Sequence, residues 1–221
     1  MFSIFKKKRE YPEFWMDYEN KFKNKVPETI EENSFVVFDT ETTGLDLKND
    51  RILSIGALKV QHKSIEVSDV FERFINQSTF NPETVAIHGI IKGDLNPDTT
   101  EEDAVIEFLS YIGNSVLVAH HVAFDVGMIN NVLYRMGLPK LKNKTLDTML
   151  LYRASRINSN LIDKERSYSL DEIAENLNIS VKDRHTSAGD AFITAIAFLK
   201  IIGRVSKQKN GRLKDLMRLN R

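Results

Sequence analysis

The feature that most restricts how this 221-residue chain can fold is an apolar run, Phe35 to Phe38, that leads directly into Asp39 and Glu41. Four consecutive apolar residues of β-forming type predict a buried strand. Side chains alternate across a strand, so both acids leave its end on one face. Two close, partly buried carboxylates repel each other, and a hard divalent cation with oxygen ligands relieves that repulsion. The stretch predicts a core strand that ends in metal ligands; the simpler alternative is a surface loop with scattered acids.

Composition limits the classes of protein that the chain can belong to. Hydrophobic residues make up 42% and charged residues 28%, which is typical of one substantial globular domain. Lys plus Arg and Asp plus Glu number 31 each, so any binding of nucleic acid must use local patches. The absence of cysteine excludes disulfides, thiolate zinc sites and cysteine nucleophiles. No secretory signal and no run of about 18 apolar residues is visible, so we expect no membrane association and a cytoplasmic location.

Strand and helix patterns alternate along the chain. Residues 51–60, 67–75 and 115–120 read as further strands, and Asn81-Pro82 predicts the start of a short helix that ends at His88. Helices are also predicted after Thr100, over residues 124–136, after the capping box of Ser169 and Glu172, and from about Thr186. This order indicates an α/β domain with a mixed central sheet.

Two further clusters carry chemically useful side chains. Asp125 follows the strand pattern of 115–120 at the start of the next helix, and His185 precedes Asp190 by five residues. Residues five apart on a helix differ by about 140° in direction, so we expect His185 in a loop and Asp190 inside the helix. The small residues Ala188 and Gly189 would let another backbone approach. Taken singly, each cluster is read more simply as a solvated acid or a structural histidine.

Together, the clusters resemble the motifs of the DEDD exonuclease superfamily, in the DnaQ-like branch with a catalytic histidine. That branch includes the proofreading epsilon subunit of bacterial DNA polymerase III. The first motif is matched in full by residues 39–45, and the third by His185, Ala188 and Asp190. The second, His-Asn-x-x-Phe-Asp, reads His120-His121-Val122-Ala123-Phe124-Asp125 here, so His121 replaces an asparagine. Residues 84–90 resemble the Val-His-Gly-Ile segment of the family, and the likeness covers residues 34–203.

The resemblance implies a ribonuclease-H-like fold and a 3′–5′ exonuclease that releases nucleoside 5′-monophosphates. It implies that two Mg²⁺ or Mn²⁺ ions are held by four acids, namely Asp39, Glu41, Asp125 and Asp190. His185 would accept the proton of the attacking water, since neutral imidazole is basic near pH 7. By the same resemblance, the pocket for the terminal nucleotide would be lined by Thr42, Thr43, Leu45, His88 and Phe124.

The most direct expectation is an enzyme that acts on single-stranded DNA ends in proofreading or repair. Two alternatives stay open: an RNA-trimming nuclease of the ribonuclease T or oligoribonuclease type, and a subunit whose chief task is to bind a DNA polymerase.

The ends of the chain suggest a division into residues 1–33, an exonuclease domain over 34–203, and a basic tail over 204–221. Helically spaced aromatic residues in the first segment either pack on the core or dock a partner; they are Tyr11, Phe14, Trp15, Tyr18 and Phe22. From Lys200 to Arg221 there are eight basic residues and one acid, so this end either steers nucleic acid or is a solvated helix face.

Overall fold

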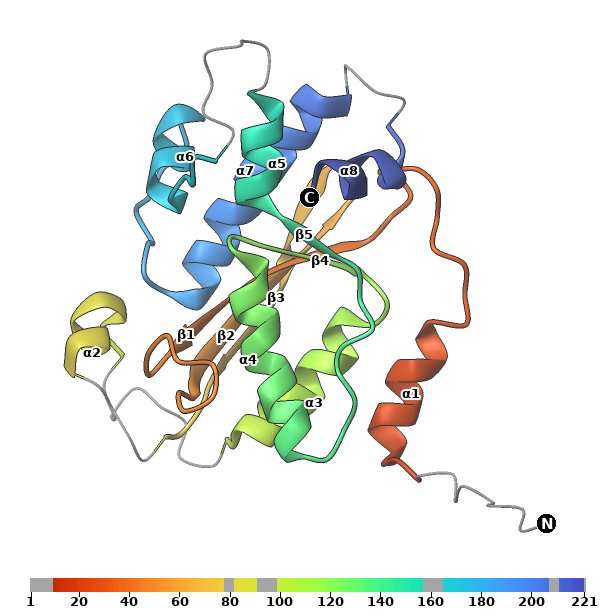
Figure 1. Ribbon diagram of the computed structural model, residues 1–221, viewed down its shortest axis with the longest axis vertical. Helices are drawn as coiled ribbons and strands as arrows, with labels where there is room; N and C mark the ends of the chain where they lie inside the picture. The colour runs from red at the N-terminus through yellow and green to blue at the C-terminus, as the bar shows by residue number, and fades with distance from the viewer. Residues whose placement is uncertain (1–9, 78–81, 91–98, 157–164, 207–210, 221) are drawn as a thin grey trace.

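The structure is a computed structural model that describes residues 10–77, 82–90, 99–156, 165–206 and 211–220. A five-stranded mixed sheet lies at its centre (Figure 1). The strand order is β3-β2-β1-β4-β5. The strands are β1 (Phe35–Thr42), β2 (Ile52–Gln61), β3 (Ser64–Phe74), β4 (Val116–Ala119) and β5 (Thr145–Asp147). β1 pairs antiparallel with β2 and parallel with β4, so the predicted mixed sheet is confirmed.

Helices cover both faces of the sheet (Figure 1). One face packs against α5 (Thr148–Ser155), α6 (Leu170–Asn176), α7 (Ser187–Ser206) and α8 (Leu213–Leu219). The other packs against α1 (Glu13–Lys21), α3 (Glu101–Ile112) and α4 (Val122–Arg135), whereas α2 (Pro82–His88) lies beside the loop that joins β1 and β2. Among the described residues, no helix is long and apolar enough to span a membrane.

Side chains of β1 point alternately into the two cores on either face of the sheet. Phe35 and Val37 enter the core beneath α7, while Val36 and Phe38 enter the core beneath α3 and α4. All four side chains are at most 2% exposed, which is why this strand reads as a continuous apolar run rather than as an alternating one.

Local signals place the helix ends where the sequence predicted them. The Thr100 side chain accepts a hydrogen bond from the Asp103 N–H at 3.1 Å, and Ser169 and Glu172 form the predicted capping box. Gly137 follows α4 with a φ of 73°, a left-handed conformation that favours glycine. The predicted cap at Asn81 lies outside the described residues.

Both ends of the described chain pack on the central domain. Trp15 and Tyr18 of α1 are fully buried beside α3, and the Tyr18 hydroxyl donates to Asn143 Oδ1 at 2.6 Å. These contacts support packing on the core as the role of the aromatic residues. Leu213 and Leu216 of α8 are buried as well, so this helix is folded against the domain. The division of the chain at residues 33 and 203 stays a prediction.

Candidate active site

Three carboxylates meet at the carboxyl end of β1. Asp39 and Glu41 continue the row of Phe35 and Val37, so they face α7, as alternation along the strand requires. Asp190 lies in the first turn of α7, and one oxygen from each of the three acids lies within 4.8 Å of the others. That separation suits a shared divalent cation, because hard cations are bound by several carboxylate oxygens at 2.0 to about 2.6 Å each.

The close approach of α7 to β2 depends on Gly56, the residue that pairs with Asp39 across the sheet. A Cβ atom at Gly56 would lie 2.2 Å from the backbone nitrogen of Ala188, so only glycine fits there. The adjacent hydroxyls of Ser54 and Ser187 hydrogen-bond at 3.0 Å. At Gly189, a Cβ atom would lie 1.8 Å from the carbonyl oxygen of Asp183. The backbone that approaches Gly189 is therefore the loop that precedes α7.

Asp125 reaches the site from the other side of the sheet. Its Oδ1 accepts from the backbone N–H of Thr40 at 2.9 Å and from the Thr40 hydroxyl at 2.7 Å. Thr40 points away from Asp39 and Glu41 because neighbouring residues of a strand face opposite ways. Asp125 consequently lies outside the group of three acids, although its negative charge acts on Asp39.

Burial and the charges of neighbouring acids disfavour ionisation of these carboxyl groups. Burial, followed by the charges of Asp125, Asp190 and Glu41, raises the pKa of Asp39 well above its usual range. Burial and then the charge of Asp190 raise the pKa of Glu41 to about 7, and burial raises the pKa of Asp125 to about 7. Such a group of carboxyl oxygens fits a divalent cation, because the charge of the cation would stabilise the ionised forms of the acids.

An arginine outside the predicted motifs partly balances this charge. The Arg184 guanidinium binds both oxygens of Asp171 in α6, at 2.6 and 3.0 Å, and also forms an ion pair with Asp190 Oδ2. The Arg184 side chain is 18% exposed and that of Asp190 is 8% exposed, so this second pair is largely shielded from water. Arg184 therefore fixes one oxygen of Asp190 and links α6 to the acid cluster.

His185 lies in the loop before α7, as the five-residue spacing to Asp190 predicted. It is exposed and has a φ of 66°, and its backbone N–H donates to Asp190 Oδ1 at 3.3 Å. Because the residue is exposed, its imidazole is accessible to solvent.

The histidine pair of the second motif has a structural explanation. His121 adopts a left-handed conformation with a φ of 59° directly before α4, a backbone state in which asparagine and histidine are enriched. Its backbone N–H donates to Asp147 Oδ1 at 3.2 Å. The neighbouring His120 ring is half-buried, with Nδ1 3.2 Å from the Thr148 hydroxyl, and burial lowers its pKa to about 4. We attribute the tolerance of histidine at position 121 to this backbone requirement.

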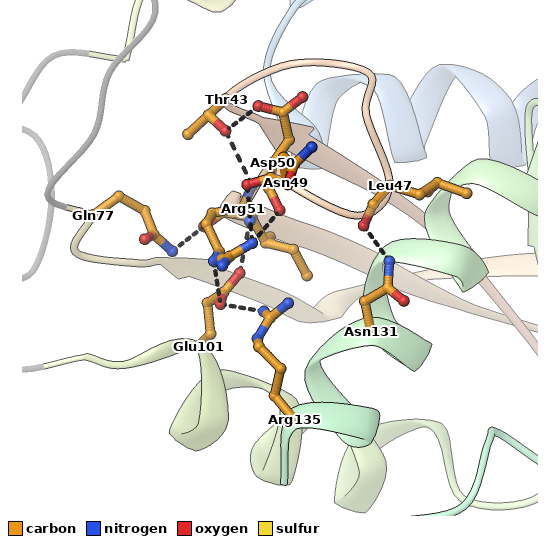
Figure 2. A network of polar contacts seen from close by, with 10 residues as sticks. Thr43, Leu47, Asn49, Asp50, Arg51, Gln77, Glu101, Asn131 and Arg135 are labelled. Carbon is orange, nitrogen blue, oxygen red and sulfur yellow. Dashed lines mark hydrogen bonds and ion pairs between the residues drawn. The ribbon is translucent and has the colours of Figure 1, made fainter.

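The two predicted threonines hold the loop between β1 and β2. The Thr42 hydroxyl donates to the Gly44 carbonyl at 2.7 Å. The Thr43 hydroxyl donates to Asp50 Oδ1 at 2.7 Å and accepts from the Arg51 N–H at 3.0 Å (Figure 2). Leu45, which follows them, is 83% exposed. The loop thus presents a large apolar side chain to solvent, and the threonine hydroxyls fix the turn that carries it.

The other two predicted nucleotide-pocket residues differ in their surroundings. Phe124 is half-buried and packs on the core beneath α4. His88 is buried, and the Ile90 N–H donates to its Nδ1 at 3.0 Å. The neutral ring therefore carries its proton on Nε2. Nε2 is buried and has no hydrogen-bond partner among the described residues.

Comparison with known proteins identifies the family. The model of the RNase T family, described as an exonuclease, matches residues 36–198. The chain belongs to the RNase T exonuclease family. It is 37% identical over 165 residues to a DNA polymerase III of PolC type from Clostridium perfringens, and 34% identical over 177 residues to one from Caldanaerobacter subterraneus. The matches cover 74% and 80% of this chain but only 11% and 12% of those polymerases. The chain is thus an exonuclease domain of the DnaQ type.

Solved exonucleases share its fold. Escherichia coli exonuclease I in complex with a dT13 oligonucleotide superposes with a TM-score of 0.65 at 16% identity, over 80% of this chain and 42% of that one. Exonuclease X in complex with 5′ overhanging duplex DNA gives a TM-score of 0.61 at 23% identity, over 82% of this chain and 98% of that one. The predicted ribonuclease-H-like fold is confirmed.

The sequence motifs did not reveal three residues of the site. Thr40 orients Asp125, and the pair of Arg184 and Asp171 holds Asp190. Thr40 lies inside the first motif, where its place between two acids on an alternating strand could have suggested a role on the opposite face. No feature of the sequence pairs Arg184 with Asp171, which lie 13 residues apart across a loop.

Proposed function

We propose that this exonuclease removes nucleotides from the 3′ end of DNA by metal-dependent hydrolysis. The observation that carries the proposal is the meeting of Asp39, Glu41 and Asp190 within 4.8 Å at the end of β1. Asp125 is the fourth proposed ligand, because it is the acid of the second motif and its negative charge acts on Asp39. The proposed cofactors are two Mg²⁺ or Mn²⁺ ions, which would supply charge stabilisation to the reacting phosphate and the leaving oxygen.

Side chains of this protein would supply the proton transfer and the contacts with the substrate. His185 accepts the proton of the water that attacks phosphorus, the bond from phosphorus to the 3′ oxygen breaks, and that oxygen takes up a proton from solvent. The products are a nucleoside 5′-monophosphate and a strand with a new 3′-hydroxyl. The Nε2–H of His88 donates to an oxygen of the terminal nucleotide, Leu45 contacts its base, and Phe124 supports the pocket. Thr42 and Thr43 hold the loop that carries Leu45 and so place Leu45 against the substrate.

Single-stranded DNA is the proposed substrate, supported by the relatives of this chain. The curated relatives are DNA polymerases, and one structural neighbour was solved with a dT13 oligonucleotide. Because the chain spans about a tenth of the length of those polymerases, association with a polymerase is a proposal as well. Editing of a primer end would then be its task.

The test is digestion of oligonucleotides that carry a label at the 5′ end, with matched DNA and RNA sequences. The proposal expects a ladder of shortened DNA products in Mg²⁺ or Mn²⁺ and no products in EDTA. Asp39→Asn and Asp190→Asn should abolish the ladder while the proteins stay folded. Faster shortening of RNA would favour the RNA-trimming alternative, and products that persist in EDTA or in both variants would refute the mechanism.

A further inference from the structure

A groove of about 600 Å³ runs along the outer side of α4, bordered by the β1–β2 loop and the segment after the helix. It begins beside Gly127, two residues after the proposed ligand Asp125, where the Leu47 side chain lies so close that a Cβ atom on Gly127 would be 2.9 Å from it. The Asn131 side-chain amide donates to the Leu47 carbonyl and closes this wall (Figure 2). Residues two apart on a helix face opposite ways, so the groove does not open on the side of α4 that carries Asp125. It is connected to the site through the β1–β2 loop, which carries Leu45 as well as the lining residues Leu47 and Lys48.

The side chains that line the groove carry positive charge. Its lining includes Lys48, Arg135 and Lys140, and no lining residue is acidic. Arg135 is held by Glu101 at 2.5 Å, and Arg51 Nε lies 3.9 Å from the same carboxylate (Figure 2). Glu101 therefore offsets the charge of Arg135, and the surplus of positive charge along the lining comes from Lys48 and Lys140. The whole chain has no net charge, which makes this local surplus an attractive surface for a polyanion.

An aromatic side chain accompanies these cations. Tyr134 lies on the exposed side of α4 and lines the groove, and 80% of it is accessible to solvent. Such exposure of a large aromatic residue contrasts with Tyr18 and Tyr152, which are each 1% exposed. Grooves that combine cations with an aromatic face bind single-stranded nucleic acid, because phosphates pair with the cations and unstacked bases stack on the ring. Bases within a duplex offer no free face for such stacking.

We propose that this groove binds the single-stranded segment of the substrate that lies 5′ of the nucleotide being removed. The proposal rests on the proposed nuclease function, because the groove is useful to that reaction only if a 3′ end occupies the site. Tyr134 stacks on one base, while Lys48 and Lys140 contact phosphates on either side of it. Affinity and processivity on long strands then depend on α4, and cleavage of the shortest substrates does not.

The experiment compares a dinucleotide with a single strand of about 16 nucleotides, the upper range of such binding sites. Binding is measured in EDTA by fluorescence anisotropy, and cleavage is measured in Mg²⁺. The variants are Tyr134→Ala and Lys140→Ala. The control is Lys63→Ala, which removes an exposed charge at the turn between β2 and β3, at the opposite end of the sheet from the acids.

Tyr134→Ala should weaken binding of the long strand about fivefold or more and leave turnover of the dinucleotide unchanged. Lys140→Ala should reduce the slope of log affinity against log salt by about 0.7, the value for one phosphate contact on a single strand. The proposal for the groove is refuted if both variants bind the long strand with wild-type affinity, or if Lys63→Ala loses as much affinity as they do. Absence of any cleavage by the wild-type protein instead overturns the nuclease proposal, and the binding data remain informative about the groove.

Discussion

Replacement of Arg184 by methionine removes the side-chain cation that pairs with Asp190. In the absence of metal, Asp190 would then lie buried beside Asp39 and Glu41 without a compensating charge. Breaking a buried ion pair costs about 3 to 5 kcal/mol, and we use the lower value of about 3 because Arg184 is 18% exposed. The Asp171 side chain is 58% exposed, so the loss of its bond adds little.

For a domain of this size, 1 kcal/mol corresponds to about 2 to 4 °C in Tm. We therefore expect Arg184→Met to lower the Tm by about 9 °C in EDTA. In saturating Mg²⁺ the difference should shrink, because bound cations neutralise the same carboxylates. A merely structural role of Arg184 would give the same loss with and without metal.

Thermal melts in EDTA and in Mg²⁺ measure both differences. Arg73→Met is the control, since it breaks an ion pair to Glu107 in which both side chains are more than 40% exposed, and it should change Tm by little in either buffer. Equal melting of Arg184→Met and the wild type in EDTA, or a loss that Mg²⁺ leaves unchanged, would refute the reasoning.

Three further predictions concern pH, the second motif and the carboxyl end. In EDTA, stability should fall as pH rises from about 4 to about 7. The cause is that Glu41 and Asp125 have a pKa of about 7 in the folded protein but lose their protons near pH 4 in the unfolded chain. A Tm that does not depend on pH would contradict this. His121→Asn should leave turnover near the wild-type value, as asparagine accepts the left-handed backbone, and a collapse of turnover would reveal a separate role for the ring. Leu216→Ala should cost about 2 to 5 kcal/mol of unfolding free energy in chemical denaturation, whereas Lys214→Ala should cost little; equal effects would argue against the packing of α8.

The parts of the fold that depend on local pattern could be predicted from the sequence. Alternation along β1 placed Asp39 and Glu41 on one face, and helical geometry placed His185 before α7 and Asp190 within it. The cap at Thr100 and the capping box at Ser169 were also visible, because both depend on residues three apart.

The parts that depend on distant contacts could not be predicted. Asp125 turns toward Thr40 across 85 residues of sequence, and the sequence alone gave no reason to separate it from the other acids. The folding of α8 onto the domain depends on buried Leu213 and Leu216 rather than on the basic residues that dominate the composition there. Contacts of this kind are set by tertiary packing, which a one-dimensional pattern does not contain.

Binding of Mn²⁺, followed by electron paramagnetic resonance near pH 7.5, tests most directly whether the acids at the end of β1 hold divalent cations. The account predicts that the wild-type protein binds Mn²⁺, that Mg²⁺ displaces it, and that Asp39→Asn abolishes binding while Lys63→Ala leaves it intact. Unchanged Mn²⁺ binding in Asp39→Asn, or no binding by the folded wild-type protein, would contradict the account.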